Sequence, residues 1–424
     1  MDIYLKILGN RILEVSFEEF DNYTKKINVK NYEDFLINMK EYQIEEEVQE
    51  RVSQLFEGEE LDDSLSKFNI KHWVSNRSFG ELIDMYENDE IIKPEMQREF
   101  VWDSLKCSRL IESILLGLPI PPLFMLEVGN SKYELVDGFQ RLNTLVNFVK
   151  GYPWSGKKNG KKNVAARLSK KVSKEIEGKT FNQLESEYQR IIKRSTIPLI
   201  EFKQLEPDNY NSKYLIFERI NTGSEKLNPM QIRKSLAYGN FMNNLYEYAN
   251  KNKKFIELFS AYNIKKDAHV EAFLRIIVMY KVYKNEFDIK DAGIINILNQ
   301  YCEEHRNDDI SEEWFAKFEH SIGFLYDIFQ KRDNICRRVI KNDQEQFIYT
   351  GSLNISILEA MVGILIGEYN KFDKHSVEKK YKNTMYEVIQ KSLNNIESNP
   401  FSNSTGTKQA ICSRFEICKG ILIK

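Results

Sequence analysis

Apolar residues in the middle of the chain switch between the spacing of a helix and that of a strand. From Asp103 they recur three and four positions apart, which predicts a helix. Gly117 and Pro119 are expected to end it, because Gly accepts the left-handed cap and Pro cannot continue the ladder. Residues 123–128 and 133–136 are short apolar runs joined by turn residues, and they predict a hairpin.

The pattern continues with another helix and another strand. Apolar positions on one face predict a helix that runs to Lys150. Residues 196–202 predict a strand, and Pro198 within it favours an edge position or a bulge. The central part of the chain is therefore expected to be an α/β domain.

After about residue 250 the spacing becomes almost purely helical. Apolar stripes cover residues 270–277 and 314–329, and a nearly continuous apolar run covers 355–366. That run is too short to cross a membrane but suits a buried helix. The predicted fold class is α+β, with an α/β domain followed by a mostly α-helical C-terminal domain.

The N-terminal segment differs from the rest in charge. Residues 1–68 hold 17 acidic and 8 basic side chains. Within them, Tyr32–Phe56 has apolar residues at helical spacing among its glutamates, which predicts a helix. Two interpretations stay open, a small solvated domain and a regulatory or polyanion-mimicking segment. We predict three parts: an acidic extension over 1–70, an α/β domain over 71–250 and a helical domain over 251–424.

Overall composition excludes several classes of protein. The 424 residues carry a formal net charge of −2, so binding to nucleic acid by overall charge is excluded and only a local patch could serve. The sequence has no secretion signal and no apolar run of membrane-spanning length. Five scattered cysteines indicate reduced thiols, so we expect a cytoplasmic protein without membrane contact.

The most informative chemistry lies in Asp137-Gly138-Phe139-Gln140-Arg141, where a predicted strand ends and a helix begins. A helix N-terminus offers unpaired N–H groups to phosphate, and Gly138 lets the backbone approach a ligand. Arg141 would add a forked, charged donor. Asp137 could hold Mg²⁺ or a ribose hydroxyl, and Gln140 could orient a water. The alternative is an Asp-Gly turn that merely caps a helix.

Three further segments accompany this motif in order. Residues 92–102 precede it, and 216–224 and 227–233 follow it. The last two fit a helix ending at Gly223 and another beginning at Pro229, with Asn228 as N-cap and Gln231 closing a capping box. A purely structural capping network stays an alternative for the polar groups at this junction, which are Arg219, Asn221 and Arg233.

Taken together, the ordered motifs resemble a known family. They are Pro-x-x-Gln-Arg-x-x-Val-Trp, Leu-Pro-Ile-Pro-Pro, Asp-Gly-x-Gln-Arg-Leu-x-Thr-Leu and Phe-x-Arg-Ile-Asn-Thr-Gly. This set resembles the ParB/sulfiredoxin-like N-terminal domain of GmrSD-type (type IV) restriction enzymes and related phage-defence proteins. The resemblance covers roughly Lys71 to Asn250 and implies a compact domain that binds and hydrolyses nucleoside triphosphates, coupled to DNA sensing or cleavage.

The resemblance also implies roles for individual residues. It places Asp137, Gln140 and Arg141 at a catalytic nucleotide site, with Asp137 as Mg²⁺ ligand and Gly138 beside the nucleotide. A larger set would complete the nucleotide pocket, namely Gln97, Arg98, Arg219 and Asn221. The family's usual Asp-Gly-Gln-Gln-Arg is here interrupted by Phe139, and its Asn-Thr-Gly-Gly by Ser224. If the replaced Gln positions water or a base, binding could survive without hydrolysis.

Full-length relatives often carry an HNH-type nuclease, and this chain has no such motif. None of its histidines falls in a His-x-x-Pro signature, and none follows residue 375. Such a nuclease needs a His as metal ligand and a His as general base. The resemblance therefore implies a partner subunit that supplies nuclease or effector activity.

A lysine-rich stretch is the best local patch for DNA. Residues 155–179 hold nine basic side chains and two acidic ones. A solvated loop and a contact surface for phosphate both fit. In the second interpretation four lysines would contact DNA phosphates, namely Lys157, Lys158, Lys161 and Lys162. Two functions thus stay open: a triphosphate-binding, Mg²⁺-dependent NTPase component of a restriction system, and a non-catalytic module that grips DNA or a partner in the same pocket.

Overall fold

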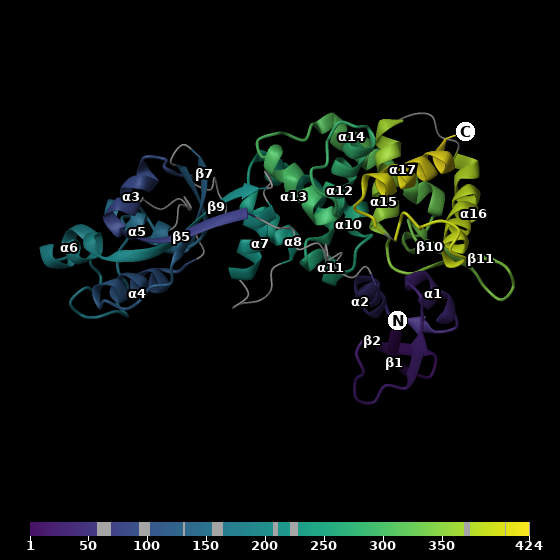
Figure 1. Ribbon diagram of the computed structural model, residues 1–424, viewed down its shortest axis with the longest axis horizontal. Coiled ribbons are helices and arrows are strands. Elements are labelled where there is room, and N and C mark those ends of the chain that lie inside the picture. The colour runs from purple at the N-terminus through teal and green to yellow at the C-terminus, as the bar shows by residue number, and fades with distance from the viewer. Residues whose placement is uncertain are drawn as a thin grey trace. The chain divides into compact units, whose positions relative to one another are not determined.

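The computed structural model describes residues 1–56, 69–92, 102–129, 132–154, 164–206, 211–220, 228–368, 374–402 and 404–423. The chain divides into two compact units (Figure 1). Unit 1 comprises Met1–Ser66, Asn228–Gln231 and Asn240–Lys424, and unit 2 comprises Lys67–Leu227 and Ile232–Gly239. This division groups the acidic extension with the helical segment; the organisation into three domains stays a prediction.

Unit 2 is built on a five-stranded mixed sheet in the order β5-β9-β7-β8-β6. Its strands are β5 (Asn69–Ser78), β6 (Ile91–Ile92), β7 (Leu123–Gly129), β8 (Lys132–Asp137) and β9 (Thr196–Glu206). The pairs β5–β9 and β7–β8 are antiparallel, whereas β7–β9 and β6–β8 are parallel.

Helices cover both faces of this sheet because alternate strand residues point to opposite sides. One face, with Leu123 and Leu199, packs on α3 (Phe79–Glu87), α4 (Ser104–Leu115), α5 (Phe139–Lys150), the short 3₁₀ turn Phe181–Gln183 and α6 (Ser186–Arg194). The other face, with Val136 and Phe202, packs on α7 (Asn211–Ile220) and the end of α8 (Pro229–Leu236). The α/β character predicted for this region is confirmed.

Local signals placed α4 correctly. The Asp103 side chain accepts a hydrogen bond from the Lys106 N–H at 2.7 Å and caps the helix. Gly117, at φ +68°, ends it. The N–H groups of Gly117 and Leu118 donate to the carbonyls of Ile114 and Ser113, which is a Schellman motif.

The edge position expected for residues 196–202 is wrong. Strand β9 lies inside the sheet, between β5 and β7. Its register with β7 begins only at Leu199, while Pro198 is paired on the β5 side alone. The missing N–H of Pro198 can therefore point to the unpaired side, where no ladder hydrogen bond is lost.

In unit 1, the N-terminal segment forms a four-stranded sheet that the sequence pattern did not predict. Its order is β3-β1-β2-β4, with β1 (Asp2–Leu8), β2 (Arg11–Ser16), β3 (Lys25–Asn28) and β4 (Gln43–Ile44). The single helix expected over Tyr32–Phe56 is instead α1 (Tyr32–Asn38) and α2 (Glu46–Phe56), because β4 pairs with β2 between them.

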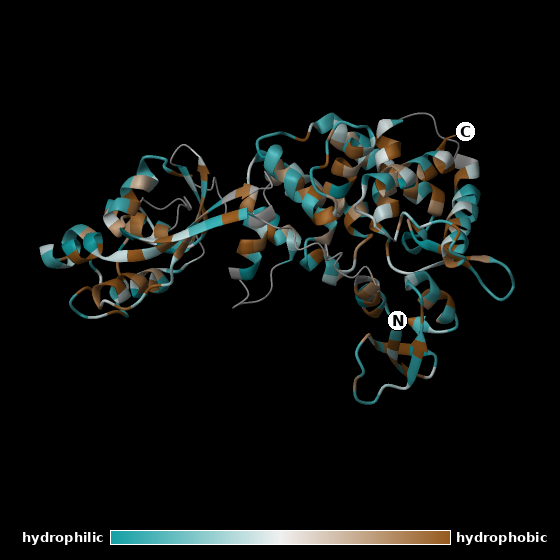
Figure 2. Ribbon diagram, in the orientation of Figure 1, coloured by the Kyte–Doolittle hydropathy of each residue, from teal (hydrophilic) through white to brown (hydrophobic). Residues whose placement is uncertain are grey.

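The rest of unit 1 is mostly helical, as predicted. Its helices are α9 (Asn240–Lys251), α10 (Lys253–Ile256), α11 (Ala261–Lys265), α12 (Ala268–Tyr283), α13 (Ile294–Glu304), α14 (Glu312–Phe329), α15 (Ile355–Gly367), α16 (Lys374–Leu393) and α17 (Lys408–Leu422). A 3₁₀ turn (Arg332–Asn334) and the hairpin of β10 (Arg338–Lys341) and β11 (Phe347–Thr350) interrupt them. Figure 2 shows α15 largely apolar and α16 largely polar, and α15 is buried along most of its length. Among the described residues, no helix is both long and apolar enough to cross a membrane.

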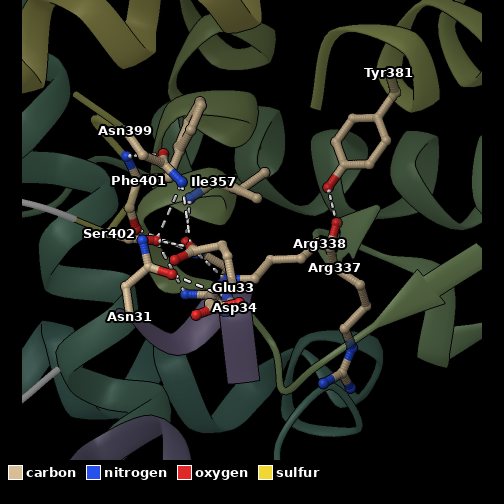
Figure 3. Close-up of polar contacts among 11 residues, drawn as sticks. Asn31, Glu33, Asp34, Arg337, Arg338, Ile357, Tyr381, Asn399, Phe401 and Ser402 are labelled. Atoms are coloured by element: carbon tan, nitrogen blue, oxygen red, sulfur yellow. Dashed lines mark hydrogen bonds and ion pairs between the residues drawn. The ribbon is translucent and has the colours of Figure 1, made fainter. Parts of the chain in front are cut away.

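A buried polar cluster joins the N-terminal segment to the helical part of unit 1 (Figure 3). The Glu33 carboxylate, 1% exposed, accepts hydrogen bonds from Arg338 Nε at 3.1 Å, Asn399 Nδ2 at 3.2 Å and the Ser402 hydroxyl. The Arg338 guanidinium also lies over the Tyr32 ring, 4.6 Å from its centre. The cluster makes α1 an integral part of this unit.

Candidate functional site

The predicted motif lies where β8 ends and α5 begins, at the edge of the apolar core of unit 2. Gly138 is the N-cap of α5, with φ +106° and ψ 9°. A Cβ atom there would lie 2.1 Å from Leu123 Cδ2. Packing and backbone conformation thus both require glycine at this position. Among the described residues no side chain caps the helix start, so the first N–H groups of α5 keep their capacity to bind an anion.

Arg141 connects this helix start to the segment before β7. Its Nη1 donates to the carbonyl oxygens of Pro121 and, at 3.1 Å, Pro122. Its Nη2 donates to Asp137 Oδ2 at 2.6 Å. The Arg141 side chain is 13% exposed and that of Asp137 is 21% exposed. Arg141 is thus held by three oxygen acceptors on two segments.

Burial and charge act on the Arg141 guanidinium in opposite directions. Desolvation lowers its pKa below the ordinary value for arginine, and the neighbouring Asp137 carboxylate partly offsets that effect. The guanidinium stays protonated at neutral pH, since the ordinary pKa of arginine lies far above neutral. The site therefore holds a permanent cation close to an uncapped helix N-terminus.

The ion pair leaves part of each partner available. Within the described residues, Nε of Arg141 and Oδ1 of Asp137 have no hydrogen-bond partner. An anion could approach the Nε/Nη2 edge, and a cation could approach Oδ1 while Oδ2 keeps its contact with Arg141. Among the described residues, no group of three His, Cys, Asp or Glu side chains could by itself hold a metal ion. A Mg²⁺ ion here would need phosphate oxygens and water to complete its ligands.

The neighbouring motif residues serve the helix as well. Phe139 is half-buried and packs against the apolar core of unit 2. Gln140 is half-buried, and its carbonyl accepts a hydrogen bond from the Thr144 hydroxyl at 2.7 Å. The aromatic side chain that departs from the family pattern therefore contributes to packing.

The other predicted residues are spread more widely. Arg219 is exposed on α7, and no hydrogen bond or ion pair joins it to Asp137 or Arg141 in the described part of the chain. Seven predicted residues lie outside the described residues: Gln97, Arg98, Asn221, Lys157, Lys158, Lys161 and Lys162. The capping box predicted at α8 is confirmed, because Asn228 and Gln231 exchange side-chain to backbone hydrogen bonds of 3.1 and 2.9 Å.

Sequence reasoning missed two features near the site. The Leu-Pro-Ile-Pro-Pro motif gives no indication that the carbonyl groups of its last two prolines accept hydrogen bonds from Arg141. A buried ion pair between Lys213 Nζ of α7 and Glu134 Oε1 of β8, at 3.1 Å, was also missed. Nothing in the sequence around Lys213 or Glu134 indicates that they pair, because the tertiary fold alone brings α7 onto β8.

Comparison with protein families gives one result. Residues 79–238 match the family model described as the N-terminal domain of GmrSD restriction endonuclease. The match begins at α3 and ends just after α8, so it leaves out β5, and it supports the resemblance to GmrSD-type restriction enzymes. Comparison with curated proteins and with solved structures found no match.

Proposed function

We propose that this protein is the nucleoside-triphosphate-binding component of a restriction system directed against phage DNA. The matched family supports a role in restriction. The resemblance of the four sequence motifs supports triphosphate binding in the same α/β domain. A partner subunit would then supply the nuclease, since the chain lacks the HNH histidines.

The observation that carries the proposal is the placing of the Arg141 cation beside the uncapped start of α5. Backbone N–H groups and a guanidinium fork are complementary to phosphate oxygens. Asp137 would ligate Mg²⁺, which when bound neutralises phosphate charge and orients the triphosphate. Hydrolysis would proceed by positioning and electrostatic stabilisation, and in this proposal Gln140 orients the attacking water. Phe139, in place of a polar residue, favours slow turnover or binding alone.

Titration calorimetry with ATP, GTP, CTP and UTP, each with Mg²⁺, tests the proposal together with a phosphate-release assay. Arg141→Ala is expected to weaken binding by about 1.5–3 kcal/mol, because a charge-assisted contact is lost. Lys150→Ala, at the exposed other end of α5, is the matched control and keeps wild-type affinity. Wild-type affinity in folded Arg141→Ala would show that the nucleotide does not bind at this site.

A second function, DNA binding without catalysis, is favoured by exposed cations in unit 2. Side chains around α6 and the preceding loop carry positive charge without an ion pair among the described residues: Lys170, Lys171, Lys174, Arg190, Lys193 and Arg194. Lys170, Lys171 and Lys174 belong to the lysine-rich stretch predicted for phosphate contact, and the other three follow it in the sequence. Backbone contacts of this kind are tolerant of sequence and weaken with salt.

The salt dependence of duplex binding tests this second function. Each phosphate neutralised contributes about 0.9 to the slope of log affinity against log salt. Replacing Lys157, Lys158, Lys161 and Lys162 with Gln is expected to flatten the slope by roughly 2 to 4 units and to leave nucleotide affinity unchanged. An unchanged slope would favour the other interpretation, that the stretch is a solvated loop without contact to DNA.

A further inference from the structure

We infer that the backbone carbonyls of Pro121 and Pro122 position Arg141 for the triphosphate, an assignment that rests on the proposed function. Both oxygens accept hydrogen bonds from Nη1. The two hydrogens of Nη1 are thereby used, and the guanidinium plane is fixed relative to the segment before β7. Pro121 and Pro122 are thus positioning residues that act through Arg141.

The orientation decides which edge of Arg141 faces a ligand. Because Nη1 is occupied by carbonyl groups, the edge left for an anion is the one formed by Nε and Nη2. Asp137 Oδ2 shares Nη2 in this structure, so phosphate would meet the guanidinium beside the Asp137 carboxylate. A lysine in place of Arg141 could not do the same, since one ammonium group cannot reach two carbonyls and present a separate fork to phosphate.

The segment that carries the carbonyls is built to hold them still. Only residues 116–122 connect α4 to β7, and three of them are Pro119, Pro121 and Pro122. Proline fixes φ and keeps the preceding residue extended, so the carbonyl directions are set before any ligand arrives. The start of the segment is not held by burial, because Leu116 and Leu118 are 65% and 52% exposed. Stiffness and the Arg141 contact therefore hold this stretch in place.

Loosening the segment is expected to weaken nucleotide binding without changing any residue that touches nucleotide. The apparent dissociation constant rises in inverse proportion to the fraction of molecules with Arg141 in the competent orientation. If that fraction falls to about one tenth, Kd rises about tenfold. By linkage, bound nucleotide would in turn order the segment.

The test compares Pro121→Ala/Pro122→Ala with Pro119→Ala, whose carbonyl makes no contact with Arg141 among the described residues. The probe is whichever of ATP, GTP, CTP or UTP, with Mg²⁺, binds wild-type protein most tightly by calorimetry. The double variant is expected to raise Kd about five- to tenfold, and Pro119→Ala less than twofold. In an Arg141→Lys background the same double change is expected to have no further effect, as for two groups acting through one contact.

Each outcome separates the two proposals. Binding in the wild type with equal Kd values for the double variant and Pro119→Ala would overturn the positioning role and leave the proposed function standing. A loss that persists undiminished in Arg141→Lys would also overturn it, because the prolines would then act elsewhere. No binding of any triphosphate by the wild type would overturn both. Should the double variant fail to fold, the single variants Pro121→Ala and Pro122→Ala are measured in the same way.

Discussion

Replacing Gly138 with alanine tests the structural basis of the site most directly. The residue has φ +106°, and an added Cβ would lie 2.1 Å from Leu123 Cδ2. Leu123 is 1% exposed and belongs to the core beneath α5, so its side chain has little room to retreat. The substitution is therefore expected to strain the backbone and to displace a packed side chain.

The two effects can be given magnitudes. A left-handed backbone costs a residue other than glycine about 1–2 kcal/mol. Overpacking of a core costs about 1–3 kcal/mol. The free energy of unfolding should therefore fall by about 2–5 kcal/mol. Gly151 is the matched control at the other end of α5, since it has φ +75° and an added Cβ would have no heavy atom of the described residues within 4 Å. Gly151→Ala should cost only the backbone strain, about 1–2 kcal/mol.

Equilibrium unfolding in urea, followed by tryptophan fluorescence, measures the difference. Three tryptophans, Trp73, Trp102 and Trp154, belong to unit 2, whereas Trp314 belongs to unit 1. A Trp314→Phe background makes the signal report unit 2. Equal losses of unfolding free energy in the two alanine variants would refute the reasoning, because the Leu123 contact would then contribute nothing.

Three further predictions concern unit 1 and the thiols. Glu33→Gln leaves a buried guanidinium without its counter-charge, so the free energy of unfolding should fall by about 3–5 kcal/mol in urea titrations. Lys40→Ala, which removes a more exposed ion pair, should lower it far less, and similar losses in the two variants would contradict the role of burial. Burial lowers the pKa of His269 below 6.5, so the unfolded chain binds a proton at His269 more readily than the folded chain does. The contribution of neutral His269 to the free energy of unfolding should therefore be fully present above pH 6.5. Below pH 6.5 the free energy of unfolding should fall by at most about 1.4 kcal/mol per pH unit, until the pH passes the folded-state pKa. His269→Phe should remove that part of the pH dependence, and an identical pH profile in the variant would count against it. Ellman's reagent should titrate only Cys412 quickly in native protein, because the other cysteines are buried and burial raises the pKa of Cys107 to about 11; a second fast thiol would contradict this.

Several elements of the candidate site could be predicted from the sequence because their causes are local. Asp103 and Gly117 mark the two ends of α4, where the hydrogen bonds join residues no more than five positions apart. The Asn228 and Gln231 side chains close a capping box three residues apart. The start of α5 after Asp137 is likewise indicated by local sequence, since Gly138 is its N-cap. Such signals can be recognised in a single sequence because helix geometry sets how many positions apart the hydrogen-bonding partners lie.

The tertiary structure decided what each side chain contacts across the fold. Pro198 indicated an edge strand, yet β9 lies inside the sheet, and Pro198 is tolerated there because the β7 ladder begins one residue later. Arg141 looked free to bind phosphate, yet it holds two carbonyl groups about twenty positions away. Glu33, in a segment notable only for its acidity, pairs with Arg338 across 305 positions. Helical and strand periods report which face of an element is buried, but they do not report what packs on that face, because partners distant in sequence are selected only when the whole core assembles.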